Sequence, residues 1–146
     1  MKYMVNEGAF DFPDGLTDRS VNMLMSIDGV SVSYVVTRDR LQEAEDLQQF
    51  IQRQFKDLSR QVSKFKELSR DEALFGQGRQ RKAGVQIQST FKQHGNEVHQ
   101  RQAVVVLDDG TQVLIVTATA LRKLTAAEEA GWTHMLASYE PAAPRS

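Results

Sequence analysis

The sequence predicts an α+β fold in which an antiparallel β-sheet is sandwiched between a long helix and a C-terminal helix. Apolar residues alternate at a period of two near the start of the chain, and from residue 41 to 65 they recur every three or four residues. The period of two then returns in the second half, with turn signals between the segments. We expect a single domain over residues 1–140 and a disordered tail over 141–146.

The N-terminal part of the chain predicts an extended segment followed by two paired strands. Residues 13–15 are Pro-Asp-Gly, a turn sequence that separates the extended opening from a strand beginning at Arg19. Alternation predicts that this strand is half-buried and that its apolar side chains share one face: Val21, Met23, Met25 and Ile27. Asp28-Gly29 is typical of a hairpin turn, and residues 30–37 predict its antiparallel partner.

The rest of the chain predicts one long helix, a run of strands and a final helix. Residues 41–65 contain no Gly or Pro and predict one amphipathic helix of about six turns. Strands are predicted at 65–75, 84–93, 97–107 and 111–119. Thr125 and Glu128 have the spacing of a capping box, and we expect the helix that follows to end near Tyr139.

Composition and charge exclude several classes of function. The formal net charge is −1, so no global field favours nucleic acid or an anionic membrane. The chain has no cysteine, which excludes a disulfide framework and a cysteine nucleophile. No apolar run approaches the roughly 18 residues of a membrane-spanning helix, and none follows Lys2 as in a signal peptide. We therefore expect a soluble cytoplasmic protein.

No motif indicates catalysis or a metal. His94, His99 and His134 are not at metal-binding spacing, and no serine lies in a nucleophile elbow, so we expect no catalytic residue, no metal and no cofactor. The loop Gly76-Gln77-Gly78 precedes several cations and is a weak candidate for anion binding. An ordinary charged loop is the simpler interpretation. A ligand-binding hypothesis on this fold would combine that loop with three side chains, Arg79, Arg81 and His99.

Several predicted strands are apolar on both faces. Val104 and Val106 point one way while Ala103 and Val105 point the other, although antiparallel sheets commonly keep one polar face. Something must therefore cover the second face. The first explanation is the C-terminal segment, with Leu121, Leu124, Trp132, Met135 and Leu136; a second copy of the chain or a client protein are the alternatives.

Four short motifs carry a resemblance to a known family. They are Asn6-Glu7-x-x-Phe10-Asp11-x-Pro13, Val21-Asn22, Tyr34-Val35-Val36-Thr37-Arg38-Asp39 and Gln100-Arg101-Gln102-Ala103. With the long helix and the late strands, these motifs resemble the Eag-type adaptor chaperones of type VI secretion. That family is related to the DcrB and PsbP/Mog1-like folds, and the similarity extends over nearly the whole chain.

The resemblance implies a PsbP/Mog1-like fold and a homodimeric cytosolic chaperone without enzymatic activity. Such a protein shields the apolar N-terminal transmembrane helices of a PAAR-domain effector and helps to load the effector onto the secretion spike. It neither binds nucleic acid nor inserts into the membrane. The alternative is a small-ligand-binding or scaffold domain of the same fold with no catalytic activity.

We assign the client-binding residues from strand or helix face and from chemistry. Methionine adapts to varied partners, and glutamine can donate to or accept from a client backbone. The predicted client-binding residues are Met23, Met25, Leu58, Val62, Val98 and Gln102. The alternative for each of them is a place in the core.

Overall fold

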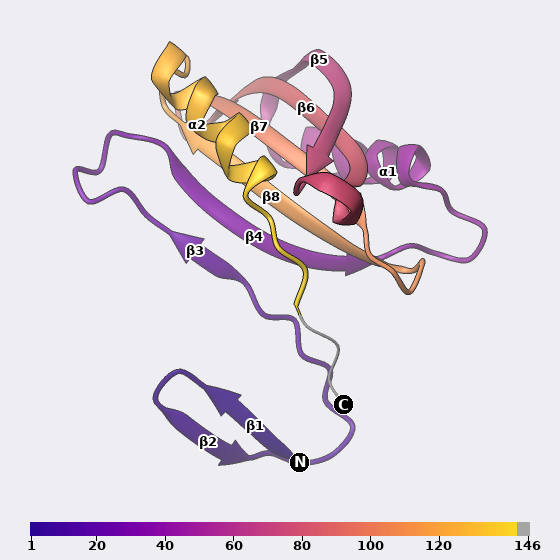
Figure 1. Ribbon diagram of the computed structural model, residues 1–146. Coiled ribbons are helices and arrows are strands. Elements are labelled where there is room, and N and C mark those ends of the chain that lie inside the picture. The colour runs from indigo at the N-terminus through magenta and orange to yellow at the C-terminus, as the bar shows by residue number, and fades with distance from the viewer. Residues whose placement is uncertain (143–146) are drawn as a thin grey trace.

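The computed structural model describes residues 1–142 as two β-sheets, two α-helices and a short 3-10 turn. A separate two-stranded sheet pairs β1 (Lys2–Val5) with β2 (Gly8–Asp11). The main sheet is antiparallel, with the strand order β3-β4-β8-β7-β6-β5 (Figure 1). Its strands are β3 (Asn22–Leu24), β4 (Ser33–Arg40), β5 (Ser63–Phe75), β6 (Lys82–Gln93), β7 (Asn96–Val106) and β8 (Gln112–Ala120). The helices are α1 (Leu47–Gln61) and α2 (Ala126–Ala137), and the 3-10 turn η1 is Gly78–Gln80.

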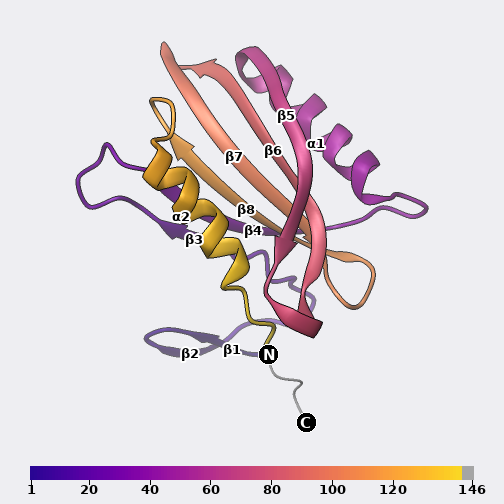
Figure 2. The same cartoon turned by 45° about the horizontal axis from the view of Figure 1, so that its top comes forward.

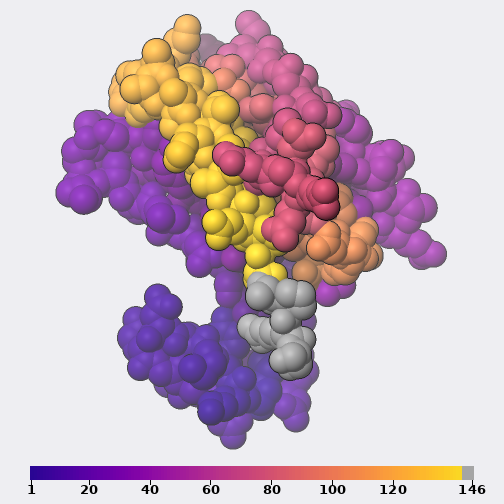
Figure 3. Space-filling model, viewed as in Figure 1, coloured from indigo at the N-terminus to yellow at the C-terminus, as the bar shows by residue number. Residues whose placement is uncertain are grey.

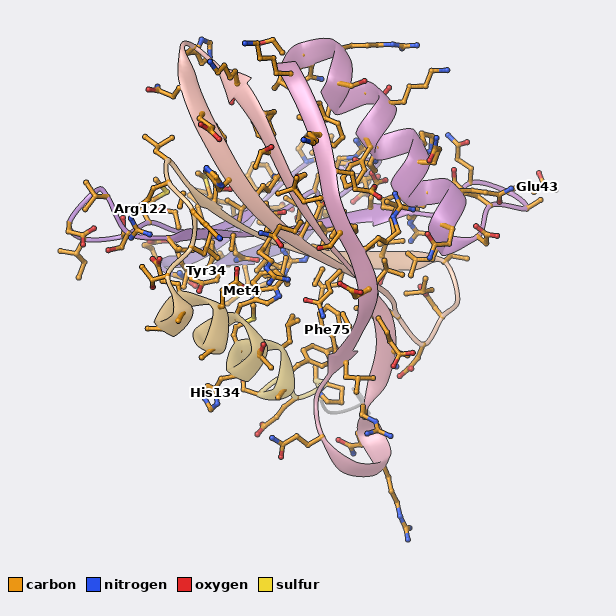
Figure 4. All side chains as sticks on the ribbon, turned by 90° about the horizontal axis from the view of Figure 1, so that it is seen from above. Met4, Tyr34, Glu43, Phe75, Arg122 and His134 are labelled. Atoms are coloured by element: carbon orange, nitrogen blue, oxygen red, sulfur yellow. The ribbon has the colours of Figure 1, made fainter. Side chains whose placement is uncertain are left out.

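The two helices lie on opposite faces of the main sheet, which confirms the predicted α+β arrangement (Figures 2 and 4). The strands predicted at 84–93, 97–107 and 111–119 are present as β6, β7 and β8, and they form an antiparallel meander. Within residues 1–142 no helix is both long enough and apolar enough to cross a bilayer. Residues 143–146 of the predicted tail lie outside the described residues, and the single-domain boundary stays a prediction.

One core cluster lies between α1 and the sheet. The helix buries Phe50, Ile51 and Phe55, at the i, i+1 and i+5 spacing of an amphipathic stripe. These side chains pack on Ile87, Val104, Val113 and Ile115 of three neighbouring strands. The helix therefore covers the part of the sheet that is nearest the loop between β7 and β8.

A second core cluster lies between α2 and the opposite face. Trp132 and Leu136 are 1% and 4% exposed, and the strands offer small side chains beneath them: Ala73, Ala103, Ala118 and Ala120. These alanines leave room for the large indole. The prediction that the C-terminal helix covers the second face is confirmed, although Leu121 is 62% exposed and takes no part in it.

The predicted strand over residues 19–28 is wrong in length and in burial. Only Asn22–Leu24 pairs with β4, and both Met23 and Leu24 are largely exposed. Met25 and Ile27 follow outside the strand and are also exposed. Apolar and polar residues do alternate in this segment. However, β3 is an edge strand with β4 as its single neighbour and no helix over it, so neither of its faces is buried.

The predicted helix over residues 41–65 is too long at both ends. Helix α1 begins after Asp46, which forms a capping box with Gln49, and Ala44 before it has a φ of 61° that no helix contains. At the other end Val62 is extended and leads directly into β5. The spacing of apolar residues thus continued beyond the helix, into the turn before Asp46 and into the start of β5. The second capping box, at Thr125 and Glu128, is confirmed.

Candidate functional site

A row of directly opposed residues crosses the face of the sheet that carries α1. Its members, in order from the β3 edge, are Met23, Val35, Thr117, Gln102 and Ile87. Met23 is 63% exposed, whereas Ile87 is 1% exposed because α1 lies over it. Only one end of this row is therefore covered by the helix.

The next row on the same face lies further from the α1 core. It contains Ser33, Thr119, Gln100 and Ser89, and the first three are only half-buried. We call the uncovered members of both rows the open sheet surface: Met23, Ser33, Val35, Gln100, Gln102, Thr117 and Thr119. Every side chain in it is uncharged, although a quarter of the chain is charged.

Two long hydrogen bonds satisfy some of the polar groups of the open sheet surface. Gln102 Nε2 donates to Thr117 Oγ1 at 3.3 Å, and the hydroxyl of Ser89 donates to Gln100 Oε1 at 3.5 Å. An amide has two N–H donors and an acceptor oxygen, so each glutamine keeps capacity for a further partner. The surface combines apolar contact with uncharged hydrogen-bonding groups.

One side of helix α1 faces this surface. Gln54 Nε2 donates to Asp39 Oδ2 of β4 at 3.2 Å, which turns that side of the helix towards β4. Leu58 follows Gln54 by one helical turn, whereas Val62 is the extended residue that follows the helix. Both are half-buried. Leu58 therefore lies on the side of α1 that faces β4.

The six residues predicted as client-binding are not all equivalent in the structure. Met23 and Gln102 belong to the open sheet surface, Leu58 lies on the side of α1 that faces β4, and Val62 follows the helix in extended conformation. Met25 lies beyond the end of β3 and is 66% exposed. Val98 is only 6% exposed, opposite Phe91, so it serves the core rather than the surface. Sequence reasoning missed Val35 and Thr117, because only the strand register shows that they lie between Met23 and Gln102.

The opposite face of the sheet contains an apolar cavity of about 420 Å³. Its walls come from two strands and the end of α2: Tyr34, Val36, Leu114, Val116, Met135 and Tyr139. Leu24 and Arg38, both exposed, complete its rim. Burial raises the pKa of the Tyr34 phenol, and the negative charge of Glu128 adds to this effect. We call this space the α2 cavity.

A family model for DcrB matches residues 7–138, which is most of the chain. The chain belongs to the DcrB family. The fold of this DcrB-family chain is also that of PA94 from Pseudomonas aeruginosa, a crystal structure described as a protein of unknown function. The two are 22% identical, the match covers 99% of this chain and 98% of PA94, and the TM-score is 0.70. No curated protein matches the chain.

The residues of the ligand-binding hypothesis do not converge in this DcrB-family protein. The glycine loop adjoins the first residue of β6, whereas His99 pairs with Thr90 near its other end. At about 3.3 Å per residue this separation is on the order of 25 Å. Among the described residues no cluster of three potential metal ligands exists, and His134 points away from the sheet on the outer side of α2 (Figure 4).

The first glycine of that loop has a packing role. Gly76 has a φ of +84°, its N–H donates to the carbonyl of Leu136 at 2.8 Å, and a Cβ would lie 2.9 Å from the carbonyl oxygen of Tyr139. Only glycine allows the backbone of α2 to approach so closely in this conformation. Gly76 therefore fixes the end of α2, which forms one wall of the α2 cavity.

Proposed function

We propose that this DcrB-family chain is an adaptor chaperone that binds and shields the N-terminal transmembrane helices of a PAAR-type effector. Its cytosolic role would be to keep that effector soluble and to help load it onto a type VI secretion apparatus. The observation that carries the proposal is the open sheet surface, an uncharged array of Met, Val, Thr and Gln that α1 leaves uncovered. The motif resemblance to Eag-type adaptor chaperones supplies the class of client.

The chemistry of the open sheet surface suits an apolar helix better than an ordinary soluble partner. Helices within a bilayer associate through close apolar packing and through uncharged Ser, Thr, Asn and Gln side chains, because an ion would be costly there. A transmembrane helix in the cytosol exposes a large apolar surface that would otherwise aggregate. Val35 and Met23 would supply apolar contact, and Gln102 would supply hydrogen bonds to the occasional polar group of such a helix.

The flanking helix and the exposed methionines fit the same role. Leu58 and Val62 would contact the second side of a client helix lying on the sheet. Met25 extends the apolar edge beyond β3, and its flexible thioether can repack around different sequences. The proposal assigns no catalytic activity and no cofactor to the protein.

The experiment is co-expression with the N-terminal helical region of a PAAR-type effector encoded beside this gene. We expect the effector fragment to become soluble and to co-purify on a tag carried by this chain. Leu58→Asp should reduce the recovered effector about tenfold, because it places a charge against an apolar helix. Ser59→Asp, on the neighbouring exposed position of the same helical turn, is the matched control and should leave recovery unchanged.

A second pair of variants avoids any effect on folding. Met25 and Met4 are both 66% exposed, but only Met25 adjoins the open sheet surface. Met25→Asp should therefore weaken co-purification, and Met4→Asp should not. An effector fragment that is soluble alone, or one that never co-purifies, would contradict the proposal and favour the ligand-binding or scaffold alternative.

A further inference from the structure

The α2 cavity is lined mostly by apolar side chains from two layers of the fold. Val36 of β4 lies directly opposite Val116 of β8, and together they form part of its floor. The end of α2 supplies Met135 as part of the roof, and the ring of Tyr139 packs edge-on against buried Phe75 at 5.9 Å. Its volume of about 420 Å³ lies within the range of small-molecule sites, which is about 300–1,000 Å³.

The N-terminal hairpin of β1 and β2 takes no part in this cavity. None of its residues lines the cavity, and Figure 3 shows the hairpin set apart from α2. A small apolar molecule between the sheet and the end of α2 would contact side chains of both layers. Such contacts on several sides are individually weak and collectively strong.

One charged residue, Arg38, lies at the rim of the cavity. Tyr34, Val36 and Arg38 alternate onto the same face of β4, so the lining changes from apolar to cationic along this strand. Arg38 Nη1 donates to Asn22 Oδ1 at 2.6 Å and to the carbonyl of Ser20 at 3.3 Å. Both acceptors are uncharged, and among residues 1–142 Arg38 forms no ion pair. The guanidinium is therefore held in place while Nε and Nη2 can serve a further acceptor.

Asp18 is close enough to Arg38 for the two charges to interact, but its carboxylate is bound elsewhere. Asp18 Oδ1 accepts from the N–H of Ser20 at 2.8 Å. Hydrogen bonds from the hydroxyls of Ser20 and Tyr3 lower the pKa of this carboxyl most, and the charge of Arg38 contributes less. The cavity thus combines an apolar interior with a cation that lacks an anionic partner among the described residues. An anion with an apolar body complements both features.

The geometry of β4 also indicates the shape of that anion. Tyr34 and Arg38 are four residues apart in the strand, which is about 13 Å at 3.3 Å per residue. A saturated carboxylate of about eight carbons, with its head at Arg38, spans most of this distance.

A peptide with a free carboxylate suits the cavity less well than an alkyl chain. Each peptide unit brings an N–H and a C=O group, and burying them without partners is costly. The lining offers few polar groups, and the hydroxyl of Ser138 already donates to the carbonyl of Met135 at 2.6 Å. An alkyl chain has no such groups to satisfy.

We propose that the α2 cavity binds a medium-chain fatty acid, with its carboxylate on the Arg38 guanidinium and its alkyl chain between β4, β8 and the end of α2. A guanidinium can bind a carboxylate through two parallel hydrogen bonds, which fixes the orientation of the head group. The site lies on the face of the sheet opposite the open sheet surface. It therefore goes beyond the proposed chaperone role and needs no client.

The first test is isothermal titration calorimetry of the full chain with octanoate, for which we expect saturable one-to-one binding. Arg38→Gln should weaken octanoate binding about tenfold, because it removes the charge that pairs with the carboxylate. The same variant should bind 1-octanol, an uncharged molecule of equal chain length, as well as the original chain does. Arg40→Gln is the matched control: Arg40 is exposed on the same face of β4 but does not line the cavity, so octanoate binding should persist.

The second test locates the alkyl chain. Val36→Phe fills the cavity and should abolish the binding of both octanoate and 1-octanol. Val35→Phe is its control, because the neighbouring residue points to the open sheet surface and octanoate binding should be unchanged. Thermal unfolding by circular dichroism checks that both variants are folded. Hexanoate requires no variant and, being two methylenes shorter, should bind the original chain about tenfold more weakly than octanoate.

Several outcomes would overturn the proposal. One is the absence of saturable octanoate binding up to about 1 mM. Another is unchanged octanoate affinity in Arg38→Gln or in folded Val36→Phe, which would place the fatty acid elsewhere on the molecule. An equal loss of octanoate and 1-octanol in Arg38→Gln would mean that Arg38 only supports the packing of the rim. Tighter binding of a peptide that ends in an apolar residue would assign the cavity to a peptide. All these measurements use the chain without an effector, so a failure of the co-purification experiment does not affect them.

Discussion

The indole nitrogen of Trp132 donates a hydrogen bond to Oε1 of Gln86 at 3.1 Å, and this contact joins helix α2 to strand β6. Gln86 also donates its Nε2 to the carbonyl of Glu72 at 2.9 Å, so its amide is held between β5 and the helix. Trp132 is 1% exposed, so its indole N–H needs an acceptor within the protein. Gln86 Oε1 also accepts from Arg101 Nη1 at 3.4 Å, and Arg101 pairs with Glu129 of α2, so the glutamine belongs to a small polar group between the sheet and the helix.

We predict that Gln86→Leu destabilises the protein. It leaves a buried indole N–H without an acceptor, which costs about 1–3 kcal/mol. Urea unfolding followed by the fluorescence of the single tryptophan measures the change. Gln88→Leu, two residues further along the same face of β6, is the matched control and should cost less. Equal losses in the two variants would contradict the role given to the hydrogen bond.

Two glycines should respond in opposite directions to the same substitution. A Cβ on Gly84 would lie 2.2 Å from the carbonyl oxygen of Val104 in the neighbouring strand, so Gly84→Ala must push β6 and β7 apart. We expect a loss of about 1–3 kcal/mol.

Gly131 supplies the control for that substitution. It lies within α2, and a Cβ there would meet nothing within 4 Å. Gly131→Ala should stabilise the protein by about 0.5–1 kcal/mol, because alanine loses less backbone entropy in a helix. Chemical denaturation of both variants checks the pair, and a stable Gly84→Ala protein would show that the strands can separate at low cost.

The free energy of unfolding should decrease in acid, because Glu128 becomes protonated there and loses its stabilising contacts. The Arg122 guanidinium, together with the N–H of Thr125, lowers the pKa of Glu128 from 4.5 to about 2. A carboxylate with a lowered folded-state pKa stabilises the protein above its unfolded pKa and loses that contribution as the pH falls towards the folded value. The contribution of Glu128 should therefore decline between about pH 4.5 and 2.

Glu128→Gln tests this dependence. At neutral pH the variant should have a lower free energy of unfolding than the original chain. This difference in free energy should become smaller as the pH falls from about 4.5 to 2. Free energies of unfolding at several pH values measure it. Glu140→Gln, at an exposed position after α2, should leave the pH profile unchanged. A constant difference at all pH values would exclude the ion pair as its cause.

The capping box of α1 should make a measurable contribution. The Gln49 N–H donates to Asp46 Oδ1 at 2.8 Å, and the Asp46 N–H donates to Gln49 Oε1 at 2.9 Å. Asp46→Ala removes the first of these bonds and should cost about 1 kcal/mol. Thermal unfolding by circular dichroism measures it, with Glu43→Ala in the preceding exposed loop as the control (Figure 4). An unchanged melting temperature for Asp46→Ala would mean that packing alone fixes the start of α1.

Local chemistry was sufficient to predict much of the fold. The Asp109 carboxylate accepts from the N–H groups of Thr111 and Gln112 in the turn where the sequence predicted one. Thr125 and Glu128 cap α2 as their spacing indicated. In each case the interacting groups lie within a few residues of one another, so the pattern is complete in the sequence.

The candidate site was predictable only in part. Met23 and Gln102 were assigned from their chemistry and face and do lie in the open sheet surface, while their client-binding role stays a prediction; Val98 was assigned to the surface although it is buried. A period of two shows which residues share a face of one strand; it does not show whether a helix lies over that face. Val35 and Thr117 complete the row between Met23 and Gln102, and the register that aligns them joins segments far apart in the chain.

By itself the sequence determined most of the strands, the existence of both helices, the turns and the capped start of α2, because these depend on neighbours along the chain. Only the tertiary structure shows that β3 is short and exposed and that α1 covers only part of its face of the main sheet. Only the tertiary structure shows that the hairpin of β1 and β2 lies apart from the main sheet. Burial depends on which distant segment packs over a residue. Strand β8 is buried because a helix packs on each of its faces, whereas no helix covers the alternating segment at β3.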